Sequence, residues 1–152
     1  MSALSPSPSS SDATFAAGSG RDGSTWQVLL GDCRDAVRQL PERSVNSVVT
    51  SPPYYWQRDY EVNGQFGLES TIDGFVNNLV EAFAAIRPAL TDDGTVFLNL
   101  GDTFYSAKGR PHGEDPKHKS RRMAGLRAVD GPGLGLPRKS LIGIPWRVAL
   151  GM

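Results

Sequence analysis

Residues 44–54 read SVNSVVTSPPY, and this stretch indicates which class of fold the chain adopts. Three valines within residues 45–50 form a β-branched, apolar run that is typical of a strand. The run leads directly into Pro52 and Pro53, which fix the backbone φ angle and remove two N–H donors. The sequence therefore predicts a strand that ends in a rigid loop.

The segments around this strand alternate between strand and helix patterns. Apolar residues recur at i, i+3, i+4 and i+7 through residues 71–87, which is the spacing of a helix with one buried face. Ser70, with Asp73 three residues later, resembles a capping box at the start of that helix. Further predicted elements are strands at residues 26–30 and 95–100, helices at residues 33–40 and from residue 144 onward, and a turn at residues 92–94.

The order β-α-β-α-β predicts an α/β fold in which the three strands run parallel. The helix at residues 71–87 is expected to pack on the sheet through Phe75, Leu79 and Phe83. In a parallel sheet, ligands bind beyond the carboxyl ends of the strands. The loop that follows residue 50 is therefore the first place to look for chemistry.

Composition limits the class of protein. The 152 residues allow one domain, and 16 basic and 16 acidic side chains cancel, which excludes a uniformly basic coat. Cys33 is the only cysteine, so an intramolecular disulfide or a multi-cysteine zinc site is excluded. Residues 1–24 are poor in apolar side chains and are predicted to be a disordered tail. With no membrane span and no signal peptide, we expect a soluble, cytoplasmic protein.

The loop after residue 50 is suited to accept hydrogen bonds. Ser51 and the Pro52 carbonyl are acceptors held in fixed directions, and the ring of Tyr54 can stack on a planar group. A planar group that carries an exocyclic amine satisfies both features. A nucleobase amine is the natural candidate, because hydrogen bonds to these acceptors draw its nitrogen lone pair out of conjugation.

This arrangement resembles the amino-group DNA methyltransferases, which methylate cytosine N4 or adenine N6. The resemblance covers roughly residues 26–150 and fits the permuted subclass in which the catalytic half comes first. It implies a partial, incomplete Rossmann-like fold with a mostly parallel sheet and S-adenosylmethionine as cofactor. The motifs that carry it are Gly31-Asp32, Thr50 with the SPPY motif (Ser51, Pro52, Pro53 and Tyr54), Gly64 to Glu69 (GQFGLE), Asp93 to Thr95 (DGT) and Asn99 to Asp102 (NLGD).

The resemblance also implies roles for individual residues. The SPPY motif is expected to be catalytic, acting on a base flipped out of double-stranded DNA. Asp32 is expected to contact the cofactor, although it is equally suited to cap the helix that begins at Cys33. Residues expected to contact the base or the DNA backbone are Tyr55, Tyr60, Asp102, Lys108, Arg110, Arg121 and Arg122. The alternatives are loop packing for Tyr55, Trp56 and Tyr60, a turn for Asp102, and a solvated basic loop over residues 103–139.

One family motif is not found in this sequence. The aromatic-x-Gly-x-Gly cofactor loop has no counterpart, since residues 131–135 follow no strand and are flanked by prolines. In the permuted subclass that loop lies downstream, so the chain is interpreted as an N-terminal fragment, residues 25–152 forming the catalytic-motif part. In the family's sheet order the strand before Asp32 does not adjoin the strand before Ser51, which predicts a partly exposed core.

Several alternatives remain open at this point. Ser51 at the first motif position favours cytosine N4, with adenine N6 as the alternative. Methylation of a glutamine side chain is less favoured, because an Asn is usual at the first position of that loop. A non-catalytic DNA-binding remnant is the rival from another class. Carbon-5 cytosine methylation and a zinc site are disfavoured, because Cys33 follows no proline and His112 and His118 lack metal-site spacing. A cognate restriction enzyme is a possible partner, and the sequence predicts no oligomeric state.

Overall fold

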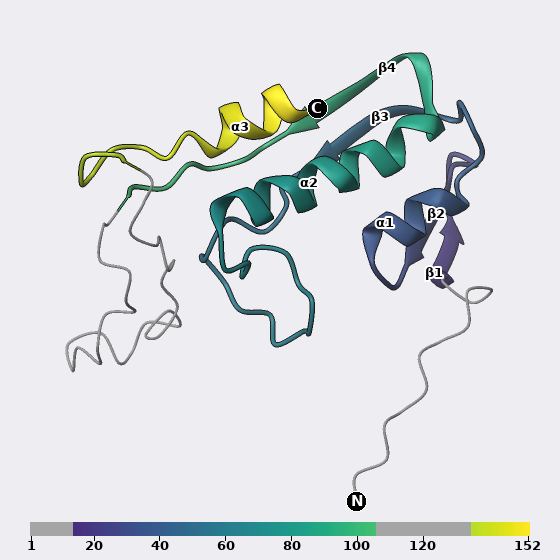
Figure 1. The fold of residues 1–152 in the computed structure, drawn as a ribbon. Coiled ribbons are helices and arrows are strands. Elements are labelled where there is room, and N and C mark those ends of the chain that lie inside the picture. Colours follow the sequence, from purple (N-terminus) through teal and green to yellow (C-terminus); the bar gives the residue numbers. More distant parts are fainter. Residues whose placement is uncertain (1–13, 106–134) are drawn as a thin grey trace, which may run out of the picture.

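The computed structural model describes residues 14–105 and 135–152 (Figure 1). Residues 1–13 and most of the predicted basic loop, 106–134, lie outside the described part. No helix in the described part is long and apolar enough to cross a membrane. The elements in chain order are strands β1 (Thr14–Ser19) and β2 (Thr25–Leu29), helix α1 (Cys33–Ala36), 3-10 helix η1 (Val37–Gln39), strand β3 (Val45–Thr50), helix α2 (Ile72–Ile86), 3-10 helix η2 (Arg87–Ala89), strand β4 (Leu90–Leu98) and helix α3 (Ile144–Gly151).

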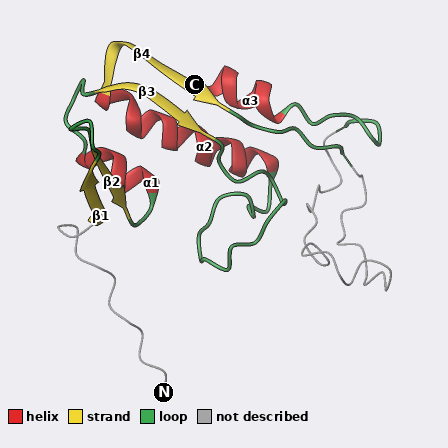
Figure 2. Cartoon of the chain, turned by 180° about the vertical axis from the view of Figure 1, so that it is seen from behind, coloured by secondary structure: helices red, strands yellow, loops and turns green. Residues whose placement is uncertain are grey.

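The predicted parallel pairing is confirmed for β3 and β4. The two strands lie side by side and point the same way, with α2 connecting them (Figure 2). Ser47 to Thr50 pair in register with Thr95 to Leu98. β4 begins five residues before the predicted start, because Leu90 already pairs with Val45. The turn predicted at residues 92–94 is an irregularity inside β4, where the register shifts between these two sets of pairs.

Helix α2 matches its predicted span but is capped one residue later than predicted. The hydroxyl of Thr71 accepts a hydrogen bond from the Gly74 amide at 3.0 Å, so Thr71 rather than Ser70 satisfies the free amides of the first turn. Phe75 and Leu79 are fully buried, as predicted, whereas Phe83 is partly buried at the margin of the core.

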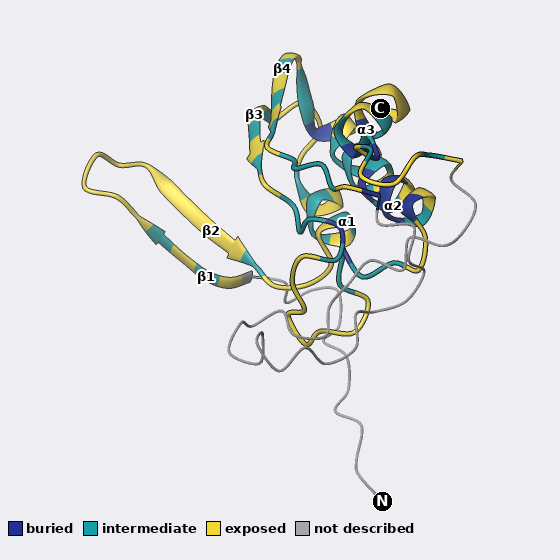
Figure 3. Ribbon diagram, turned by 90° about the vertical axis from the view of Figure 1, so that its left-hand side faces the viewer, coloured by how far each residue is buried: buried dark blue, intermediate teal, exposed yellow. Residues whose placement is uncertain are grey.

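The core lies between α2, α3 and the inner face of the β3–β4 sheet. Helices α2 and α3 lie on the same side of this sheet, and their buried residues face each other (Figure 3). Ile144 and Val148, four residues apart on α3, are 1% and 0% exposed. Leu98 and Leu100 pack against this core from the end of β4 and the segment that follows it. The core therefore supports the ends of β3 and β4.

The predictions for residues 14–30 are corrected by the structure. β2 does not join the parallel sheet but pairs antiparallel with β1, and residues 14–24 were expected to be disordered. The hairpin forms because Asp22 accepts hydrogen bonds from the Ser24 amide and hydroxyl while Gly23 takes a φ of 83°. Gly18 also leaves room for the ring of Trp26, which a Cβ would approach within 2.7 Å. The hairpin projects away from the helices (Figure 3).

The outer face of the β3–β4 sheet is apolar and exposed. Val49 and Phe97 are neighbours across the strand pair and are 81% and 61% exposed. Parallel sheets are ordinarily covered on both faces. In this structure the outer face of the pair carries exposed apolar side chains, whereas the core lies on the inner face.

Candidate active site

The SPPY motif lies at the carboxyl end of the parallel strand pair. Thr50, the last residue of β3, accepts a hydrogen bond from the Asn99 amide at 2.9 Å, which joins the ends of β3 and β4. Ser51 is exposed, while Pro52, Pro53 and Tyr54 are half-buried. The prolines end the strand pairing, so the motif leaves the sheet at the edge where ligands of parallel sheets bind.

The ring of Tyr54 lies directly over the backbone of Gly101. A Cβ at residue 101 would lie 2.9 Å from Cε2 of Tyr54 and 3.1 Å from Cδ2. A Cβ essentially never lies within 3.0 Å of another heavy atom, so the ring can take this position because residue 101 is a glycine. The segment after β4 thereby fixes where the motif's aromatic ring lies.

The loop that follows the motif folds back on it. The Gln57 amide donates to the Tyr54 carbonyl at 3.2 Å, which closes a turn, and the Trp56 amide donates to the Gly67 carbonyl at 2.6 Å. Trp56 has a φ of 52°, and a bulky residue in the left-handed region costs about 1–2 kcal/mol. Its indole Nε1 donates to the Glu69 carbonyl at 2.8 Å. These hydrogen bonds hold Trp56 in its strained conformation.

The two other tyrosines predicted to line the base site lie in different surroundings. Tyr55 is 3% exposed and its ring packs on Phe75 with 5.3 Å between ring centroids. Its side chain therefore belongs to the core, which favours the packing alternative for Tyr55 over its predicted contact with the base. Tyr60 is 51% exposed on the loop, and its amide donates to Gln65 Oε1 at 2.7 Å.

Asp102 follows the end of β4 as predicted, but its carboxylate holds the start of α3. Its two oxygens accept hydrogen bonds from the amides of Gly143 and Ile144 at 2.9–3.1 Å, and Oδ1 also accepts from the Thr103 amide. A carboxylate at a helix N-terminus satisfies free amides and opposes the positive end of the helix dipole. In this structure Asp102 thus acts as a cap that ties α3 to the end of β4, and its contact with the target base stays a prediction.

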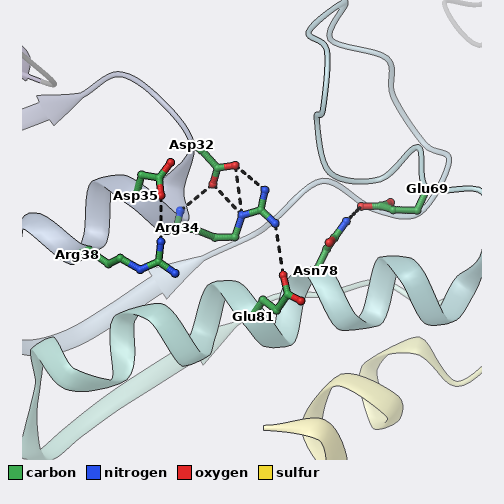
Figure 4. A network of polar contacts seen from close by, with 7 residues as sticks. All are labelled: Asp32, Arg34, Asp35, Arg38, Glu69, Asn78 and Glu81. Atoms are coloured by element: carbon green, nitrogen blue, oxygen red, sulfur yellow. Dashed lines mark hydrogen bonds and ion pairs between the residues drawn. The ribbon is translucent and has the colours of Figure 1, made fainter. Parts of the chain in front are cut away.

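Asp32 caps α1 and is held by Arg34. The Arg34 amide donates to Asp32 Oδ1 at 2.9 Å, and the guanidinium contacts both carboxylate oxygens, with Nη2 at 2.6 Å from Oδ2 (Figure 4). These hydrogen bonds to Arg34 lower the pKa of Asp32 below its ordinary value, against the opposing effect of partial burial. The guanidinium also lies 5.2 Å from the ring centroid of Phe66, and it forms an ion pair with Glu81 of α2. The helix-cap alternative for Asp32 is thus the role the structure displays.

Cys33 is exposed beside Asp32 at the start of α1. Partial burial of the thiol, followed by the negative charge of Asp32, raises its pKa. In residues 14–105 and 135–152, no three His, Cys, Asp or Glu side chains gather into a group that could hold a metal ion. His112 and His118 lie outside those ranges.

A cavity of about 520 Å³ lies beside the loop that follows the motif. Its carboxylates carry negative charge, which favours amines or cations over phosphate groups. The predicted DNA-backbone residues Lys108, Arg110, Arg121 and Arg122 lie outside the described residues. The residues that line the cavity are Asp59, Glu61, Val62, Asn63, Gly64, Gln65, Leu68, Glu69 and Asn78.

Comparison with protein families gives a match over residues 45–130, more than half of the chain, to the family described as DNA methylase. This range begins with β3, includes the SPPY motif and α2, and ends beyond β4. The chain belongs to this N6/N4 DNA methylase family.

Curated relatives extend the similarity over most of the chain. This DNA methylase chain is 45% identical to the Type II methyltransferase M.Cfr9I of Citrobacter freundii over 82% of its own length, and 40% identical to M.SmaI of Serratia marcescens over 83%. The matched regions are 41% and 42% of those two relatives, so the chain spans less than half of their length. It is 35% identical to M.SfiI of Streptomyces fimbriatus over 86% of its length. No solved structure matches the chain.

Four residues that shape this candidate site received no individual role from the sequence, although Glu69 and Gly101 lie within the GQFGLE and NLGD motifs. Arg34 engages Asp32, Gly101 lies under Tyr54, and Glu69 and Asn78 form a hydrogen-bonded pair between the loop and α2. The interaction of Arg34 could have been predicted from the sequence, because a basic side chain two positions after an acidic helix cap can reach the carboxylate of that cap. Glu69 was marked only as the end of the GQFGLE motif, and Asn78 gave no signal, since the helix pattern marks residue 78 only as part of a polar face.

Proposed function

We propose that the chain supplies the catalytic segment of a Type II DNA methyltransferase that methylates an exocyclic amine of a base in DNA. The observation that carries this proposal is the SPPY motif at the carboxyl end of β3, with Tyr54 fixed against Gly101 at the end of the neighbouring parallel strand. The relatives' names, Type II methyltransferases, support the same reaction class. Double-stranded DNA is then the substrate, and a cognate restriction enzyme is an expected partner.

Each motif residue has a role in this proposal. Ser51 and the Pro52 carbonyl accept hydrogen bonds from the amine and so increase the nucleophilicity of its nitrogen. Pro53 keeps the loop rigid, and Tyr54 stacks on the base after it has left the duplex. The exposure of Ser51 and the half-buried position of Tyr54 suit residues that receive a substrate from solvent. Exposed Tyr60 remains a proposed contact with the DNA, as do Lys108, Arg110, Arg121 and Arg122.

The favoured target is cytosine N4, with adenine N6 as the alternative. The basis is Ser rather than Asp at the first motif position, although both side chains accept a hydrogen bond from an amine. Membership of the DNA methylase family counts against a protein glutamine as the substrate.

S-adenosylmethionine is the proposed methyl donor, and the described residues do not by themselves form its site. Asp32, the predicted contact, has its carboxylate oxygens engaged by Arg34, and residues 14–105 and 135–152 contain no glycine-rich loop after a strand. We propose that a Rossmann-like sheet is completed by residues that correspond to the uncovered part of the relatives. The chain alone is expected to transfer no methyl group and to show no micromolar affinity for S-adenosylmethionine in isothermal titration.

The test uses a chimera in which this chain is fused to the part of M.Cfr9I outside the aligned region, called here the completed chimera. Nucleoside mass spectrometry of DNA from cells that express it is expected to detect N4-methylcytosine. N6-methyladenine alone would overturn the choice of base. Neither product, from a chimera that is folded by circular dichroism, would favour a non-catalytic DNA-binding remnant and contradict the proposed function.

A further inference from the structure

The loop that carries the aromatic end of the SPPY motif is tied to helix α2 through one carboxylate. Glu69 uses both oxygens as acceptors, and Oε2 accepts from the Gly67 amide at 2.9 Å. Figure 4 shows the second contact, in which Oε1 accepts from Asn78 Nδ2 at 2.9 Å. Both hydrogen bonds are partly shielded from solvent. Asn78 stands on α2 next to the fully buried Leu79. The pair thus joins the loop to α2, the helix with the most buried residues.

Gly67 transmits this connection to the motif. Its carbonyl accepts from the Trp56 amide, and a Cβ at residue 67 would lie 2.9 Å from the Tyr54 carbonyl oxygen and 3.3 Å from Pro53 Cβ. The backbone of residue 67 therefore lies so close to the motif that there is no room for a side chain between them. A shift of Gly67 has to move Tyr54 and the turn at Trp56 with it.

We infer that Glu69 and Asn78 are positioning residues that set the place of Tyr54 through Gly67 and Trp56. The inference rests on the proposed function, in which Tyr54 stacks on the base. Neither side chain needs to touch the substrate for this role. The left-handed conformation of Trp56 persists only while its neighbours restrain it, and this pair supplies the restraint from α2.

The chemistry of the pair allows an exchange of donor and acceptor. In the variant Asn78→Asp, two carboxylates face each other and the donor to Oε1 is lost. In Glu69→Gln, rotation of the Asn78 amide restores a hydrogen bond, so little change is expected. In the double variant Glu69→Gln with Asn78→Asp, the new amide donates to the new carboxylate while its oxygen accepts from Gly67. The matched control is Asn77→Asp, which adds the same charge at the exposed neighbouring position of α2.

Hydrogen exchange followed by NMR in the full 152-residue chain tests the loop. Asn78→Asp is expected to speed exchange at the Trp56 indole and the Gly67 amide by about 10- to 100-fold, the scale of losing a hydrogen bond to a charged group. The Leu79 amide in α2 and the control variant should change little, and the double variant should restore slow exchange. Equal acceleration at Leu79, or no rescue in the double variant, would overturn the inference.

The completed chimera gives the second readout. Asn78→Asp is expected to lower kcat by about tenfold or more with little change in KM for DNA, and the double variant to recover most of kcat. An unchanged kcat in an active chimera would overturn the positioning role. An inactive parent chimera would instead contradict the proposed function, and the exchange measurement would then decide alone whether the pair positions the Tyr54 loop.

Discussion

Ser51 and Tyr54 flank the two prolines of one rigid loop but differ in exposure and in their proposed contacts with the substrate. Ser51 is exposed and offers a hydroxyl, whereas the half-buried Tyr54 offers a ring whose position Gly101 allows. A variant at each position therefore separates the two halves of the proposed chemistry.

In the completed chimera, Ser51→Ala is expected to lower the methyl-transfer rate by about 100-fold, as for the loss of one preorganised polar contact. DNA affinity should change little, because a serine hydroxyl adds little to a large phosphate interface.

Tyr54→Ala is expected to lower the rate and to weaken binding of the flipped base by about 1–3 kcal/mol. Single-turnover rates measure methyl transfer. Titration with DNA that has an abasic site opposite the target base measures binding of the flipped base. A large loss of DNA affinity in Ser51→Ala would contradict the assigned roles.

Asp32 gives a prediction about pH. Its folded pKa lies below the ordinary value, so its stabilising effect is complete above the unfolded pKa of about 3.9 and is lost as the pH falls through the folded pKa. Asp32→Asn keeps a good helix cap but removes the charge that Arg34 engages. The variant should be modestly less stable than the parent chain near pH 6, and the difference should shrink near pH 3. Urea unfolding at both pH values measures this, and an equal difference at both would contradict the role of the ion pair.

At the scale of single elements, the cap of α2 distinguishes two neighbouring residues. Thr71→Ala removes the hydroxyl that accepts from the Gly74 amide and is expected to cost about 1 kcal/mol of unfolding free energy. Ser70→Ala is the matched control and should be within about 0.5 kcal/mol of the parent chain, because it is exposed and outside the cap. Thermal or urea unfolding of both variants checks the result. A larger loss in Ser70→Ala would return the helix start to the sequence-based position.

The elements also show which parts of the fold the sequence can predict. Residues 45–50 and 71–87 were predicted because their information is local: valines before two prolines, and apolar residues at helical spacing. The β1–β2 hairpin was missed because the low apolar content of residues 1–24 outweighed the Asp22-Gly23 turn signal.

The candidate site divides in the same way. The place of the SPPY motif at a strand end follows from its immediate neighbours. Asp102 finds its partners, Gly143 and Ile144, about 40 residues away, and Tyr55 finds Phe75 on another element. A cap and a core contact between distant segments cannot be read from spacing along the chain, so the sequence left a structural role and a substrate contact open for both residues.

At the scale of the whole molecule, the outer face of the β3–β4 sheet is exposed in this chain and is expected to be covered in the completed chimera. Phe97→Lys is expected to change the stability of the isolated chain by less than about 0.5 kcal/mol, because the side chain is already 61% exposed. In the completed chimera the same variant should abolish methylation, since a lysine buried there would lack a partner. Gln39→Lys, which adds the same charge at an exposed position of η1 outside the motifs, is the control and should leave methylation intact. An active Phe97→Lys chimera would show that this face stays open.

Cys33 makes the chain ready for site-specific labelling. It is the only thiol in the sequence and is exposed at the start of α1, so a maleimide fluorophore would attach at one position without any engineered residue. Its raised pKa keeps the thiolate scarce at neutral pH, which makes labelling faster in mildly alkaline buffer. The dye would be attached next to Asp32 and Arg34, and the Arg34 guanidinium contacts the ring of Phe66. Changes in its emission would report, in real time, any rearrangement around Asp32 and Arg34 when the protein is mixed with another molecule.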